Sequence, residues 1–241
     1  MARGQLELRD VALALAGKPV IAGLSLTVAA SDLVTVMGPS GSGKSSLLAF
    51  ICGTLDPAFR ASGAVRLDGA DITGLPPERR RVGILFQDDL LFPHLSVAEN
   101  LAFGLPPALA GRQARAARIE RALAEADLAG FAARDPATLS GGQRARVALL
   151  RTLLAEPKAL LLDEPFVKLD VALRDRFRRF VFEHARAEGL PTLLVTHDPA
   201  DAEAAGGPVV DLAAAGARTT RDSVPEAAPP KPGIAAPKPA R

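Results

Sequence analysis

Alternating apolar and polar positions mark the first part of the chain. Residues 6–15 (LELRDVALAL) alternate over much of their length, and Leu24, Leu26 and Val28 repeat the pattern. Residues 63–69 (GAVRLDG) form a further short run of the same kind. Because alternation is typical of strands with one buried face, we expect a small antiparallel sheet near the N-terminus.

Continuous apolar runs appear later and predict a different kind of strand. Residues 33–37 (LVTVM), 159–163 (ALLLD) and 192–196 (TLLVT) are typical of parallel strands that are buried on both faces. Helical patterns lie between them, at residues 44–52, 114–129, 141–155 and 171–188. Strands that alternate with helices predict an α/β fold with a mostly parallel sheet of the P-loop type, covered on both sides.

The same patterns predict one domain with an insertion and a tail. No convincing strand interrupts the helical patterns from residue 108 to 154, so we expect a helical subdomain, roughly residues 88–157, inserted in a domain that spans residues 1–218. The last 23 residues, 219–241, contain six prolines and little apolar bulk. Such a composition favours a disordered tail.

Composition narrows the functional classes. The formal net charge of +2 is contributed entirely by residues 219–241, which leaves the rest neutral and gives no basic footprint for nucleic acid. Cys52 is the only cysteine, which excludes an intramolecular disulfide and a cysteine zinc site; we expect it to be a buried apolar residue. Because no charge-free apolar stretch approaches about 18–20 residues, no membrane-spanning helix is expected.

The segment GPSGSGKS, residues 38–45, lies between an apolar run and a predicted helix. It satisfies the G-x-x-x-x-G-K-[ST] pattern, whose glycines let the backbone wrap a polyphosphate; a plain Gly/Ser turn is the alternative. Lys44 reaches phosphate oxygens in such loops, and the hydroxyl of Ser45 holds Mg²⁺. The predicted nucleotide-binding residues of this loop are Gly38, Pro39, Ser40, Gly41, Ser42, Gly43, Lys44, Ser45 and Ser46.

Two other strand ends carry polar side chains. Asp163 and Glu164 follow one buried run, where the first acid would hold Mg²⁺ and the second would act on the attacking water as general base. A solvated turn is the alternative for such a pair. His197 follows the next buried run, and we expect it to contact the γ-phosphate rather than to serve a structural role.

Residues 139–143 (LSGGQ) open the helix predicted at 141–155. A helix start presents free N–H groups and the positive end of the helix dipole, which suits an anion. The chain would therefore contain a second phosphate site.

The order of P-loop, glutamine, LSGGQ, LLLDEP and histidine resembles the ATPase subunits of ABC transporters, from Leu6 to about Leu212. The resemblance implies a head-to-tail dimer in which each MgATP lies between one chain's P-loop and the other chain's signature helix. It implies that the γ-phosphate of the ATP held by the partner chain is bound by Ser140, Gly141, Gly142 and Gln143. It also makes Gln87 a link between Mg²⁺, the attacking water and the transport channel.

Three stretches look closest to the short YnjD-like ATPases of bacterial importers: RVGILFQDDLLFPHLSVAENL, DPATLSGGQRARVALLRTLLAEPKALLLDEPF and LDVALRD. This implies work at the cytoplasmic face of the inner membrane with a permease and a periplasmic solute-binding protein. Residues 88–96 would lie against the permease, although Leu90, Leu91 and Phe92 could equally be core residues.

The chain departs from the family pattern at two places. ABC ATPases normally stack adenine on an aromatic side chain of the N-terminal sheet, but residues 15–20 offer only aliphatic contacts, which predicts weak discrimination between bases. Val167 stands where many relatives have a serine that contacts across the dimer.

A soluble ABC ATPase of DNA repair, translation or assembly is the alternative function.

Overall fold

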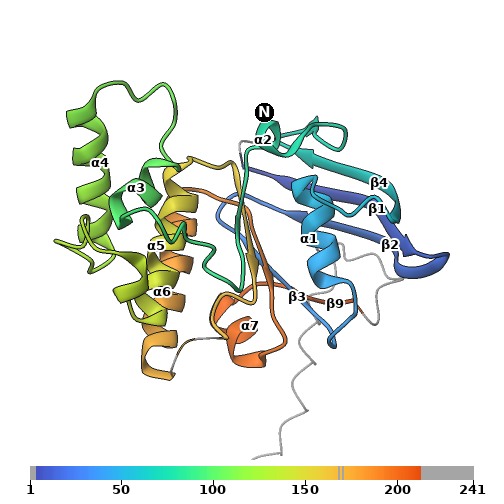
Figure 1. Ribbon diagram of the computed structural model, residues 1–241. Helices are drawn as coiled ribbons and strands as arrows, with labels where there is room; N and C mark the ends of the chain where they lie inside the picture. The colour runs from blue at the N-terminus through green and yellow to red at the C-terminus, as the bar shows by residue number, and fades with distance from the viewer. Residues whose placement is uncertain (1–3, 168, 170, 213–241) are drawn as a thin grey trace, which may run out of the picture.

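The computed structural model describes residues 4–167, 169 and 171–212, which form two sheets (Figure 1). In that part of the chain, an antiparallel sheet has the order β2-β1-β4-β5, with strands at Lys18–Val28, Leu6–Leu15, Phe59–Leu67 and Ala70–Asp71. A parallel sheet has the order β6-β7-β8-β3-β9, with strands at Val82–Leu85, Ala159–Asp163, Thr192–Val195, Leu33–Met37 and Val209–Asp211. The expected α/β fold with an N-terminal antiparallel sheet is confirmed.

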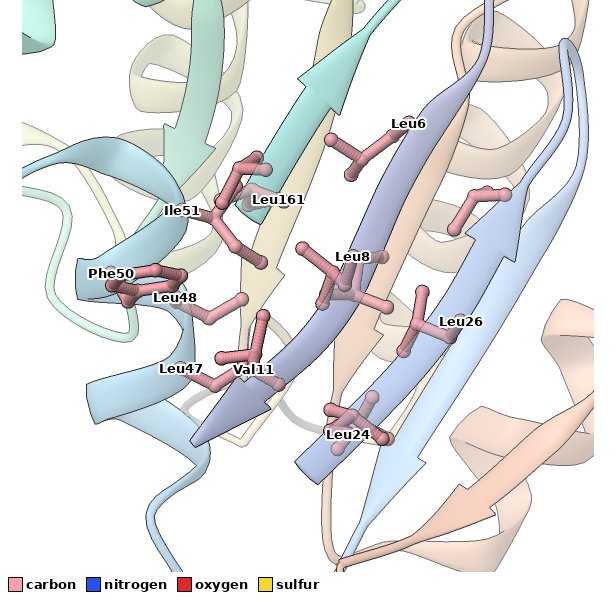
Figure 2. Packing of buried hydrophobic residues seen from close by; sticks show 14 of the residues in the cluster. Leu6, Leu8, Val11, Leu24, Leu26, Leu47, Leu48, Phe50, Ile51 and Leu161 are labelled. Atoms are coloured by element: carbon pink, nitrogen blue, oxygen red, sulfur yellow. The ribbon is translucent and has the colours of Figure 1, made fainter. Parts of the chain in front are cut away.

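Helix α1 (Lys44–Cys52) lies between the two sheets. Figure 2 shows its Leu47, Leu48 and Ile51 among side chains of β1 and β2, with Leu161 of the parallel sheet close by. All of them belong to one buried cluster. The helix that follows the P-loop is therefore fixed by both sheets at once.

The parallel sheet is buried on both faces. Alternate residues of its strands point to opposite faces, and each face packs against its own cluster. In β7, Ala159 and Leu161 belong to the cluster around α1, whereas Leu160 and Leu162 belong to a second cluster. That second cluster is covered by α5 (Gly141–Leu154), α6 (Val171–Ala187) and α7 (Pro199–Ala205). The continuous apolar runs thus belong to strands that are buried on both faces, as the sequence predicts.

Residues 88–157 contain helices and no strand. Helix α3 (Val97–Ala102), helix α4 (Arg112–Glu125), a 3-10 turn at Pro136–Thr138 and α5 pack around a third buried cluster. Helix α3 begins with a capping box, in which Ser96 and Glu99 each bond the other's backbone N–H. This stretch lies between β6 and β7 along the chain, and its bounds as a subdomain stay a prediction.

Strand β4 is longer than the sequence predicts. It begins at Phe59, four residues before the run predicted at 63–69, because pairing with β1 extends it. Cys52 is buried as expected, and this burial raises the pKa of its thiol to about 11. The predicted tail at 219–241 lies outside the described residues. None of the helices that the structure describes is long and apolar enough to cross a membrane.

Arg80 closes the far end of α1. It lies at the end of the short helix α2 (Pro77–Arg80) and is buried. Its guanidinium donates to the carbonyl oxygens of Phe50 and Ile51 at 2.8 and 2.9 Å and to that of Leu75 at 2.8 Å. A cation at this end also suits the negative pole of the helix dipole.

We predict that Arg80→Met lowers the free energy of unfolding by about 2–4 kcal/mol, because it removes the guanidinium donors of several carbonyl oxygens, two of them in buried bonds. The neighbouring Arg79 is exposed, so Arg79→Met is the matched control and should stay within about 0.5 kcal/mol. Urea denaturation followed by circular dichroism measures both. Equal losses in the two variants would contradict this role of Arg80.

Candidate functional site

A cleft of about 460 Å³ opens where three strands of the parallel sheet end. Its polar part brings together many of the residues that the sequence singled out, namely Ser40, Gly41, Gly43, Lys44, Ser45, Ser46, Gln87, Asp163 and Glu164. This volume is within the usual range for small-molecule sites. The convergence of these side chains follows from topology, since carboxyl ends of parallel strands meet at one edge.

The P-loop connects β3 to α1. Gly43 is the N-cap of α1 with φ 91°, and a Cβ at this position would lie 2.5 Å from Cγ1 of Val20, so only glycine fits. Lys44 is almost fully buried, and its ammonium donates to the carbonyl oxygens of Gly38 and Pro39 at 2.8 and 2.9 Å. The loop thus surrounds a positive charge at the start of a helix, which is a favourable place for an anion.

Ser42 has a buried hydroxyl oxygen with no hydrogen-bond partner among the described residues. Such an orphaned group inside the loop suits a loop that wraps an oxyanion.

Asp163 and Ser45 form a hydroxyl–carboxylate pair in the cleft. Ser45 Oγ donates to Asp163 Oδ1 at 3.4 Å. Burial raises the pKa of the Asp163 carboxyl and Glu164 adds to the rise, whereas Ser45 and Lys44 oppose it. A cation would favour the ionised carboxylate in this position.

These oxygens fit Mg²⁺. The described residues contain no group of three or more His, Cys, Asp or Glu side chains that could hold a metal by themselves. Mg²⁺ is commonly bound by one or two protein oxygens together with substrate phosphates. A hydroxyl, a carboxylate and the nearby Gln87 amide beside a P-loop match that donor set.

Glu164 has an uncommon backbone conformation. Its φ is 47°, in the left-handed region, and its N–H donates to the carbonyl oxygen of Val195 at 2.9 Å. Its Oε1 lies 3.1 Å from Nδ1 of His197. Because β8 lies beside β7, the two side chains that the sequence placed at separate strand ends meet directly.

Residues that sequence reasoning missed fix the backbone before and after His197. Thr196 donates to the buried carboxylate of Asp201 at 2.8 Å. Asp198 caps α7, and Arg174 of α6 bonds its second oxygen at 2.9 Å. The signal for the cap was the dipeptide Asp198-Pro199, since Asp before Pro is typical of a helix start.

The signature segment lies outside this cleft. Ser140 is the N-cap of α5, and Ser140 and Gln143 form a reciprocal capping box at 3.3 and 3.0 Å. Ser140 and Gly141 are exposed, whereas Gly142 is buried. The structure therefore does not bring these predicted residues to the chain's own P-loop.

Gly142 has a packing reason of its own. A Cβ added there would lie 1.8 Å from Cδ2 of Leu173, whereas one added at Gly141 would only reach ordinary contact distance, 4.0 Å, from the Arg144 guanidinium. Packing within the chain thus requires a glycine at 142 but not at 141.

Phe59 is a cleft residue that the sequence analysis overlooked. The apolar part of the cleft consists of Leu15, Val20 and Phe59. The expectation of aliphatic contacts at residues 15–20 is correct, but an aromatic ring from β4 lies beside them. Phe59 would have been found if the predicted strand at 63–69 had been extended back to residue 59, where β4 begins.

The segment after Gln87 leads away from the cleft and is tied to α5. Arg144 forms an ion pair with Asp89 at 2.8 Å, and Arg151 donates to the carbonyl oxygen of Leu90 at 2.9 Å. Leu90 is 55% exposed, whereas Leu91 packs against two of the buried clusters, so the residues of this segment divide between surface and core.

Two phenylalanine rings continue the exposed part of this segment. The rings of Phe92 and Phe103 pack in a tilted arrangement with centroids 4.7 Å apart, and Phe103 is 67% exposed. An apolar surface consisting of Leu90, Phe92 and Phe103 therefore faces outward beside the signature helix.

Comparison with known proteins gives consistent matches. The family model described as ABC transporter matches residues 21–167. The chain is 50% identical over 205 residues to the uncharacterized ABC transporter ATP-binding protein YnjD of Escherichia coli, covering 85% of this chain and 94% of the relative. It is 44% identical over 183 residues to the taurine import ATP-binding protein TauB of Pseudomonas fluorescens (76% and 67%) and 46% identical over 178 residues to the thiamine import ATP-binding protein ThiQ of Chelativorans (74% and 71%).

We predict that Gly142→Ala lowers the free energy of unfolding by about 1–3 kcal/mol, because Leu173 must move to admit the methyl group. Gly141→Ala adds the same methyl group one residue earlier, at ordinary contact distance from Arg144, and its melting curve should match the wild type. Thermal denaturation without nucleotide compares the two. A stable Gly142→Ala variant would show that the helix contact is looser than described.

Proposed function

The chain belongs to the ABC transporter family, and on that premise we propose that it powers solute uptake through a separate membrane permease. ABC transporter ATP-binding proteins are ATPases coupled to transport, and this chain is one of them. The observation that carries the proposal is the convergence of Lys44, Asp163, Glu164 and Gln87 on one cleft, from which a single segment leads to an exposed apolar surface.

In the proposed site, ATP lies with its phosphates along the P-loop. Lys44 and the N–H groups at the start of α1 bind the β- and γ-phosphates. Ser45, Asp163 and Gln87 would hold Mg²⁺, which neutralises phosphate charge when bound. Formation of this site would separate the Lys44 ammonium from the loop carbonyls that it now contacts.

Glu164 acts as general base on the water that attacks the γ-phosphate. The contact between Glu164 and His197 supports a shared role, in which His197 contacts the γ-phosphate and steadies the water. The bonds of Thr196 and Asp198 fix the backbone on either side of His197, and a donor on a fixed backbone is worth more in a transition state than a mobile one.

A second copy of the chain completes the site. Ser140, Gly141, Gly142 and Gln143 are needed at the γ-phosphate but lie outside their own chain's cleft. A head-to-tail dimer would bring this helix start to the partner's nucleotide. ATP then holds the two chains together, and hydrolysis removes the phosphate they share.

The permease is proposed to dock on Leu90, Phe92 and Phe103. Exposed apolar side chains grouped in this way are a common mark of a protein interface. Arg144 and Arg151 join this surface to the signature helix, so a movement of that helix on nucleotide binding would be passed to the permease.

The transported solute is not determined by this subunit in the proposal. Relatives that match similarly well are named for taurine, thiamine and Fe(3+) import. We place the chain at the cytoplasmic face of a bacterial inner membrane, with a periplasmic solute-binding protein selecting the solute. A soluble, non-transport ABC ATPase is the alternative, and no feature of the described residues favours it.

Glu164→Gln should retain ATP binding, lower turnover by at least about 100-fold and accumulate an ATP-dependent dimer, because the amide cannot accept a proton from water. Equilibrium binding, phosphate release and light scattering measure the three properties. Lys44→Ala is the control, since it should bind little ATP and stay monomeric. A Glu164→Gln chain that remains monomeric with saturating ATP and Mg²⁺ would contradict the shared site.

Phe103→Glu should reduce recovery of the membrane permease with this subunit by about tenfold or more, because a charge replaces an exposed ring at the docking surface. Recovery is measured by affinity purification from detergent-solubilised membranes. Leu75 is also an exposed large apolar residue but lies in another part of the chain, between β5 and α2, so Leu75→Glu is the matched control. If both variants retain the permease equally, this docking surface is wrong.

A further inference from the structure

The cleft has two chemically different ends. Its P-loop end carries the ammonium of Lys44 and the carboxylates of Asp163 and Glu164. Its apolar part consists of Leu15, Val20 and Phe59, none of which has a polar group in its side chain. The lining is therefore charged and polar around the P-loop and apolar at these three side chains.

Phe59 is held in place by structure on both sides. Before it, the Asp56 carboxylate accepts from the N–H of Ala58 at 2.8 Å, and the Asp56 carbonyl accepts from the N–H of Phe59 at 2.9 Å. After it, β4 pairs with β1, and Phe59 lies directly opposite Leu15. Because residues opposite each other in an antiparallel pair share a face, the two side chains form one surface.

This surface is continuous with the P-loop. Val20 approaches Gly43 so closely that a Cβ on the glycine would lie 2.5 Å from it. Phe59 is only partly buried where it packs against the core, so part of the ring remains accessible from the cleft. The apolar end therefore begins where the phosphate end stops.

We propose that Phe59 is the residue on which the base of the bound nucleotide stacks, with Leu15 and Val20 completing the apolar seat. The inference rests on the proposed binding of ATP at this cleft and adds a specificity-determining residue from a strand that the family pattern does not indicate. Base–aromatic stacking contributes substantially to affinity and tolerates different bases, because every base has a π-face.

The seat has a defined selectivity. It favours a triphosphate that carries an aromatic base over one that carries none. Since its three side chains offer no hydrogen-bonding group, they distinguish adenine from guanine only weakly. ATP and GTP thus bind similarly well, and inorganic triphosphate binds less well than either.

The chain's composition allows a direct test. It contains no tryptophan and no tyrosine, so Phe59→Trp introduces its only indole fluorophore. ATP and GTP should quench this fluorescence, whereas inorganic triphosphate should leave it nearly unchanged. Phe103→Trp, at an exposed position outside the cleft, is the matched control and should respond to none of the three. Phe59→Trp fluorescence that does not respond to bound ATP would overturn the proposal.

Affinities measured by isothermal titration complete the test. Phe59→Ala should weaken ATP and GTP binding by about 5- to 100-fold and leave triphosphate binding unchanged. Phe59→Leu retains apolar bulk without a ring and should show a smaller loss, which guards against misfolding of the alanine variant. If Phe59→Ala binds ATP as the wild type does while Lys44→Ala loses both ligands, the nucleotide site stands and the role of Phe59 is wrong. If the wild type binds neither ATP nor triphosphate, the proposed function itself fails.

Discussion

Burial of β3, β7 and β8 on both faces is the constraint from which the site arises. In β7, alternate residues are packed under α1 on one side and under α5 and α6 on the other, so the strand has no freedom to slide or turn. The position of Asp163 and Glu164 is then set by where the apolar run ends. Even the strained φ of Glu164 is supported, because its N–H is bonded to the neighbouring strand. A rigid edge of this kind holds the polar side chains at the strand ends in fixed positions relative to one another.

The part of the fold governed by local pattern could be predicted from sequence. Continuous apolar runs predicted β3, β7 and β8, and the P-loop pattern predicted the start of α1 at Lys44. What failed depends on long-range pairing. Phe59 is followed by Arg60, Ala61 and Ser62, all exposed, so this stretch lacks the large buried apolar residues that mark a strand, and pairing with β1 makes it one.

The same distinction applies to the site. Lys44, Glu164 and His197 could be predicted because each has a recognisable neighbourhood in the sequence. Arg174 could not, since it acts on Asp198 from a different helix, 24 residues away along the chain. The packing of Gly142 on Leu173 was equally invisible, because the motif already offered the glycine another explanation. Motifs therefore predicted side chains that the fold brings to the cleft or beside it, whereas the residues that position those side chains emerge only from the packing.

The ties from Arg144 and Arg151 to the segment after Gln87 have a thermodynamic consequence. They make the signature helix and the proposed docking surface parts of one body, so two ligands at different places act on the same equilibrium. Linkage is reciprocal: if nucleotide changes the affinity of that body for a permease by some factor, the permease must change the affinity for nucleotide by the same factor. The isolated subunit and the assembled transporter would then differ in how tightly they hold ATP, with no residue of the nucleotide cleft altered.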